Sequence, residues 1–148
     1  MGDGSLTHPP FVNYSEINQY KKHYERVYCH GPIITFDGIS VRFRKIQFAH
    51  CFFESSKRNG IKDVFSEKRS KRIDWIKSTL QDPHAHLYIG WDNRRKRLDS
   101  KRRVAIVMGN YVVIIQLTSP QKAFFITAYV ADSSGSLYKI KRSPRWAP

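Results

Sequence analysis

Apolar residues recur at helical spacing in two stretches of the N-terminal half of this chain. The first stretch begins near Asn13, which with Glu16 three residues later resembles a capping box, and it ends at Gly31 and Pro32. Its apolar positions lie three or four residues apart and are Ile17, Tyr20, Tyr24, Val27 and Tyr28. This spacing predicts an amphipathic helix.

A second helix is predicted from Ser66, a residue type that caps helices, to the Asp-Pro pair at 82–83. Its apolar positions are Ile73, Ile76 and Leu80. Arg69 and Arg72 each lie four residues before one of these positions. Both arginines are therefore expected at the edge of the apolar face, where a cation can reach a cleft or simply lie along packed surface.

Alternation of apolar and polar residues predicts a half-buried strand at 39–43. The aromatic segment 48–54 is consistent with a short helical turn or with the end of a strand. Four further strand candidates follow the second helix, at 86–91, 103–108, 111–117 and 123–130. A Gly-Asn turn joins the middle pair, whereas 92–102 is predicted to be a long basic loop.

These elements predict an α+β fold, with N-terminal helices packed on a four-stranded antiparallel sheet. The 148 residues are expected to form a flexible lead-in at 1–13 and one domain at 14–148. No apolar run approaches the roughly 18 residues of a membrane span, and the N-terminus lacks a secretory signal pattern. We therefore expect a cytoplasmic protein that does not enter a membrane.

The formal charge of +14 is concentrated in the middle of the chain. The segment from Arg42 to Arg103 contains 18 of the 26 lysines and arginines but only seven acidic residues. Such a field attracts polyanions, which favours a nucleic-acid partner, with an acidic protein as an additional or alternative one. The residues expected to contact nucleic acid are Lys57, Arg58, Arg94, Arg95, Lys96, Arg97, Arg102 and Arg103.

No metal or other cofactor is expected. Cys29 and Cys51 are interpreted as buried free thiols, because the chain has no pair of closely spaced cysteines typical of zinc sites. The acidic residues are scattered, whereas a magnesium-dependent nuclease needs converging carboxylates.

Chemistry without a metal is still possible for these residues. His50 is flanked by aromatic residues that are expected to draw it partly out of water. It could then serve as a general acid or base, or it could be a core histidine that is hydrogen-bonded to a backbone carbonyl. Positions 125, 127 and 129 are expected on one face of a strand, with the hydroxyls of Thr127 and Tyr129 side by side. Both are also ordinary strand residues.

Several short motifs in order resemble the phage and polymorphic-toxin branch of the barnase, EndoU, colicin and RelE-like nuclease superfamily. They are His50-Cys51-Phe52-Phe53, then Phe65 with Arg69, Arg72, Ile73, Trp75 and Ile76, then Leu80 with Pro83, then Tyr111-Val112-Val113, and Phe125-Ile126-Thr127-Ala128-Tyr129. The resemblance covers residues 36–132. It implies a helical half before a four-stranded antiparallel sheet.

The resemblance also implies roles for five residues. His50 would be the general acid or base, Arg69 and Arg72 phosphate clamps, Thr127 a donor to the scissile phosphate, and Tyr129 a stacking or positioning group. The leading hypothesis is a metal-independent endoribonuclease, a toxin or phage-associated effector delivered into a target cell, that leaves 2',3'-cyclic phosphate ends on RNA. Transfer RNA is one candidate substrate, and an acidic immunity or antitoxin protein is a candidate partner.

The alternative hypothesis is a non-catalytic RNA- or DNA-binding module on the same fold. It would hold single strands with Phe125, Tyr129 and the basic loops.

Overall fold

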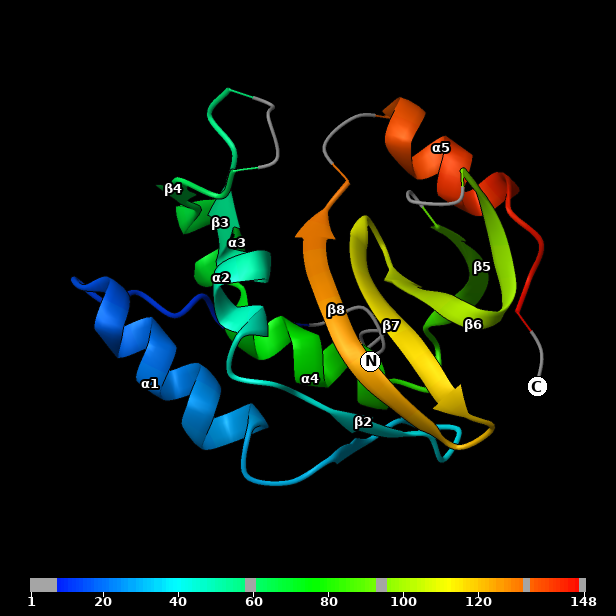
Figure 1. Ribbon diagram of the computed structural model, residues 1–148, viewed down its shortest axis with the longest axis horizontal. Helices are drawn as coiled ribbons and strands as arrows, with labels where there is room; N and C mark the ends of the chain where they lie inside the picture. The colour runs from blue at the N-terminus through cyan, green and yellow to red at the C-terminus, as the bar shows by residue number, and fades with distance from the viewer. Residues whose placement is uncertain (1–7, 58–60, 93–95, 132–133, 147–148) are drawn as a thin grey trace, which may run out of the picture.

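The computed structural model describes residues 8–57, 61–92, 96–131 and 134–146, with the backbone alone at 91–92, 97–103 and 134–137. Figure 1 shows the arrangement of its elements. The helices are α1 (Ile17–Tyr28), α2 (Gln47–Phe52), α3 (Glu67–Ser70), α4 (Ile73–Gln81) and α5 (Ser134–Arg142). The strands are β1 (Ile33–Ile34), β2 (Ser40–Arg42), β3 (Phe53–Glu54), β4 (Val64–Phe65), β5 (His86–Asp92), β6 (Arg97–Met108), β7 (Tyr111–Ser119) and β8 (Lys122–Val130).

The fold class α+β is confirmed, but the main sheet differs from the predicted four antiparallel strands. Six strands lie in the order β1-β2-β8-β7-β6-β5, and β3 and β4 form a separate pair. Strands β5 to β8 make the expected antiparallel meander. β2 then pairs in parallel with β8, so the sheet is mixed. About 80 residues separate these two partners, and no local sequence pattern indicates such a pairing.

Two apolar clusters cover the two faces of the main sheet. The larger cluster joins the sheet to α1, α2 and α4, and the smaller one lies on the opposite face, where Ile140 of α5 packs against it. Figure 1 shows α1, α2 and α4 gathered on one side of the sheet, with α5 beside β5. The tyrosines of α1 are central to the larger cluster, because Tyr24 and Tyr28 are fully buried.

The predicted helices form with different boundaries. α1 begins at Ile17 and is capped by Glu16, whose side chain and that of Gln19 make a reciprocal capping box, so the predicted cap at Asn13 is wrong. Ser66 does cap a helix, since its Oγ accepts a hydrogen bond from the Arg69 amide. That helix is α3, which stops after one turn, and α4 starts anew at Ile73.

Two other segments also differ from their predictions or resolve an open choice, and the C-terminal segment adds a further helix. The aromatic segment 48–54 is helical through α2 and becomes extended at β3, so both interpretations hold in part. β6 begins at Arg97, which makes the link after β5 shorter than the predicted loop. The C-terminal segment forms α5, after which Trp146 is buried and its amide donates to the Leu87 carbonyl.

Candidate functional site

Helix α2 lies along the part of β8 that β2 leaves unpaired. β2 pairs only with residues 122–124, so the next carbonyls on this edge need other partners. Gln47 Nε2 donates to the Ile126 carbonyl at 2.8 Å, and Cys51 Sγ donates to the Ala128 carbonyl at 3.6 Å. Figure 1 shows α2 beside β8. We call this region, with Arg69 of α3, the α2–β8 junction.

His50 lies at this junction, on the solvent side of α2. It follows Gln47 by three residues, which places the two side chains on neighbouring positions of one helical flank. Its side chain is exposed, so the expectation that aromatic neighbours draw it out of water is wrong. The aromatic residues beside it in the sequence point to the other side of α2, where Phe48 and Phe52 are buried.

A β-bulge decides which side chains of β8 face the junction. Thr127 pairs with Ile114 and Phe125 pairs with Ile115, so Ile126 has no partner of its own on β7. Phe125 is consequently buried in the larger core, whereas Tyr129 packs against the smaller cluster on the opposite face. Thr127 and Tyr129 share a face as predicted, but Phe125 does not lie with them.

Arg69 connects α3 to both walls of the junction. Its Nη1 donates to the Cys51 carbonyl at 3.0 Å, and its guanidinium lies 5.6 Å from the centre of the Tyr129 ring. Burial raises the pKa of the Cys51 thiol, and hydrogen bonds to Ala128 and Thr127 together with the charge of Arg69 partly oppose this rise. The side chains of Arg69, Thr127 and Tyr129 therefore lie around the end of α2, at the residue that follows His50 in the chain.

Arg72 does not join this group. Its Nη1 donates to the Lys68 carbonyl, and its guanidinium stacks over Phe11 at 4.8 Å and Trp75 at 5.0 Å. In one continuous helix, Arg69 and Arg72 would share a face. The break between α3 and α4 makes Arg72 the N-cap of α4 and turns its side chain toward the N-terminal segment. The expectation that both arginines clamp one phosphate is therefore not met by this arrangement.

The residues expected to contact nucleic acid are only partly described. Lys57 and Lys96 are exposed, in the bend after β3 and the turn before β6. Arg97, Arg102 and Arg103 belong to the first part of β6, residues 97–103, for which the backbone alone is described. The remaining three, Arg58, Arg94 and Arg95, lie outside the described residues.

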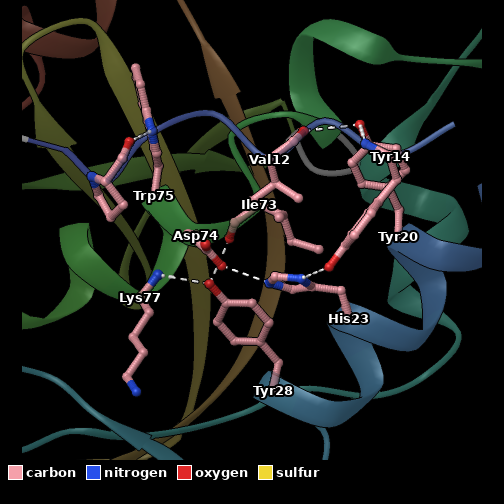
Figure 2. Close-up of polar contacts among 10 residues, drawn as sticks. Val12, Tyr14, Tyr20, His23, Tyr28, Ile73, Asp74, Trp75 and Lys77 are labelled. Atoms are coloured by element: carbon pink, nitrogen blue, oxygen red, sulfur yellow. Dashed lines mark hydrogen bonds and ion pairs between the residues drawn. The ribbon is translucent and has the colours of Figure 1, made fainter.

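A buried polar cluster was missed by the sequence analysis and is shown in Figure 2. His23 of α1 is 7% exposed, its Nε2 lies 2.7 Å from Asp74 Oδ1, and its Nδ1 lies 2.9 Å from the Tyr14 hydroxyl. These contacts attach α1 and the segment before it to α4. His23 lies three residues after Tyr20, on the apolar face of α1, and this spacing is the signal that indicates burial.

Within residues 8–57, 61–92, 96–131 and 134–146, no three His, Cys, Asp or Glu side chains are arranged to hold a metal ion. In the same ranges, no helix has the length and apolar character needed to cross a membrane. Both cysteines are free, Cys51 fully buried and Cys29 partly so. No protein-family model, curated protein or solved structure matches this chain.

Proposed function

We propose that this protein is a metal-independent endoribonuclease whose site is the α2–β8 junction. The observation that carries the proposal is the contact of Arg69 with both α2 and Tyr129, which sets a guanidinium and two hydroxyl-bearing side chains at the end of the short helix that carries His50. Histidine exchanges protons near neutral pH, and fixed cations and hydroxyls stabilise the charge that develops on a phosphate.

The proposed reaction needs no metal. The 2'-hydroxyl of RNA attacks the adjacent phosphorus, the new O2'–P bond forms as the P–O5' bond breaks, and the 5' oxygen gains a proton. His50 takes the proton from the 2'-hydroxyl or supplies the one to the 5' oxygen. Arg69 and Thr127 donate to the phosphate oxygens, and Tyr129 positions the nucleotide. The products are a 2',3'-cyclic phosphate and a 5'-hydroxyl end.

The charge of the protein supports a nucleic-acid substrate, and the motif order described above supports this reaction class. A chain with a formal charge of +14 attracts RNA over distances longer than any single contact. A toxin or phage-associated effector that is held inactive by an acidic protein would have these properties, and such an inhibitor would cover the junction around the exposed His50.

The test is incubation of the purified protein with a defined single-stranded RNA in EDTA. We expect cleavage that leaves 2',3'-cyclic phosphate ends, no cleavage of the DNA of the same sequence, and a loss of about 100-fold or more in His50→Ala. Thr127→Val should also cleave the RNA more slowly than the wild type. The matched controls are His84→Ala and Thr118→Val, two exposed residues away from the junction, and both should cleave normally.

Intact RNA with the wild-type protein would overturn the proposal, as would equal cleavage by His50→Ala. RNA binding that falls steeply with salt but yields no product would instead favour the non-catalytic binding module.

A further inference from the structure

Cations and a half-exposed aromatic ring share the outer face of β2 and β8, beside the junction. Arg42 is paired with Phe124 across the two strands, so their side chains lie on the same face. The neighbours of Phe124 along β8 are buried in the larger core, and Phe124 therefore points to the outer side. The Arg44 guanidinium lies 4.7 Å from the centre of its ring, and Lys122 is exposed two residues away.

We call Arg42, Arg44, Lys122 and Phe124 the basic-aromatic face. Because of the bulge at Ile126, Thr127 and Tyr129 point to the same side of the sheet as Phe124. Three residues of strand separate Phe124 from Thr127, which corresponds to about 10 Å. An RNA strand whose phosphate lies at Thr127 can therefore extend as far as the Arg44–Phe124 pair.

The charge on this face is available to a ligand. Among the residues that the structure describes, no carboxylate forms an ion pair with Arg42, Arg44 or Lys122. Phosphate groups are the complementary partner for such cations. Arginine planes and aromatic rings also stack with nucleobases, and this requires bases that are not already paired inside a duplex.

We propose that the basic-aromatic face binds a nucleobase and a neighbouring phosphate of single-stranded RNA. The base stacks on the Arg44–Phe124 pair, while Arg42 and Lys122 contact the phosphate. The assignment of RNA and of the direction toward the junction rests on the function proposed above. The face itself would act as the part of the site that selects unpaired RNA, and it involves none of the residues assigned to the chemistry.

The test is fluorescence anisotropy with a fluorescein-labelled single-stranded RNA whose 2'-hydroxyls are all methylated, so that binding is measured without cleavage. Phe124→Leu keeps the apolar bulk and removes the ring, and we expect it to raise the dissociation constant by about five- to 100-fold. Arg44→Gln should weaken binding, because it removes the guanidinium that stacks with the base. Lys122→Gln should weaken binding and reduce the salt dependence by roughly one phosphate contact. A duplex of the same sequence should bind less tightly than the single strand.

Two matched variants serve as controls. Phe11 is also exposed and also lies beneath a cation, Lys71, but it packs on Trp75 instead of the sheet, so Phe11→Leu should bind like the wild type. Arg26→Gln removes one exposed charge from α1 and should leave the affinity nearly unchanged. Thermal melting of each variant verifies that it is folded.

Unchanged affinity in folded Phe124→Leu and Arg44→Gln would overturn the inference, even if RNA cleavage were observed. Equal loss of affinity in the two control variants would overturn it as well, because the effect would then be general. Conversely, selective loss in Phe124→Leu with no cleavage of unmodified RNA would uphold the binding face and remove the proposed catalysis. The two proposals therefore fail in different experiments.

Discussion

Arg69 donates a hydrogen bond from Nη1 to the main-chain oxygen of Cys51, at 3.0 Å, where α2 ends. The carbonyls in the last turn of a helix lack partners within the helix and carry partial negative charge, so a guanidinium is favourable there. The same guanidinium lies over the Tyr129 ring. One side chain thus contacts both α2 and β8, and it places a cation at the carbonyl of the residue that follows His50.

We predict that Arg69→Lys slows RNA cleavage by about tenfold or more, approaching the roughly 100-fold loss that follows removal of a fixed donor at a reaction centre. Lysine keeps the charge but lacks the planar group that contacts both Cys51 and Tyr129. The measurement is the initial cleavage rate, with thermal melting to verify folding. Arg72→Lys is the control, since Arg72 stacks on Phe11 and Trp75, and it should cleave at nearly the wild-type rate. Equal rates for the two variants would contradict the assignment of Arg69.

The two adjacent phenylalanines of β8 should respond very differently to truncation. Phe125 is fully buried and stacks on Phe43 with ring centres 4.7 Å apart, so Phe125→Ala should lower the free energy of unfolding by about 3–5 kcal/mol. Phe124→Ala should cost less, because this side chain is only partly buried. Urea denaturation of both variants measures the difference. A larger cost at Phe124 would contradict the assignment of these two neighbours to opposite faces of β8.

The contacts of His23 are predicted to stabilise the fold without taking part in cleavage. His23→Leu leaves the carboxylate of Asp74 and the hydroxyl of Tyr14 without their partner, and it should lower the free energy of unfolding by about 1–3 kcal/mol. His30→Leu changes an exposed histidine beyond the same helix and should cost little. Cleavage per folded molecule should match the wild type, and a selective loss of cleavage would place His23 in the site.

The two thiols should be distinguishable by their reaction with a thiol reagent. Burial raises the pKa of both, so each is mainly in the unreactive thiol form at neutral pH. Cys29 is partly exposed and should react in the native protein, at a rate that continues to rise with pH beyond the ordinary thiol pKa of about 8.5. Cys51 should react only after unfolding. The Cys29→Ser variant tests this, and rapid labelling of its one remaining thiol would contradict the burial of Cys51.

Local sequence patterns predict much of this fold because their causes are local. The apolar face of α1, the Ser66 cap and the turn between β6 and β7 each depend on residues a few positions apart, and each is present. The parallel pairing of β2 with β8 depends on residues about 80 positions apart, and the bulge at Ile126 on the fit between two strands. Neither leaves a short pattern in the sequence.

The candidate site was predictable to a similar extent. Positions 50, 69, 127 and 129 were predicted to act together, and the structure brings Arg69, Thr127 and Tyr129 to the end of the helix that carries His50. The direction of Arg72 could not be deduced, because the helix that carries it breaks after a single turn. The bulge at Ile126 likewise could not be deduced, so Phe125 was assigned to a stacking surface although it is fully buried and its neighbour Phe124 is the partly exposed one.

The contact of α2 with β8 also determines when the junction can exist during protein synthesis. One wall of the junction is α2, near residue 50, and the other is β8, which is complete only at Val130. Contacts so distant in the chain close a long loop, and they form late in folding. A nascent chain that has not yet reached Val130 has His50 but no complete β8 beside it, so the proposed site would be incomplete until β8 has been translated.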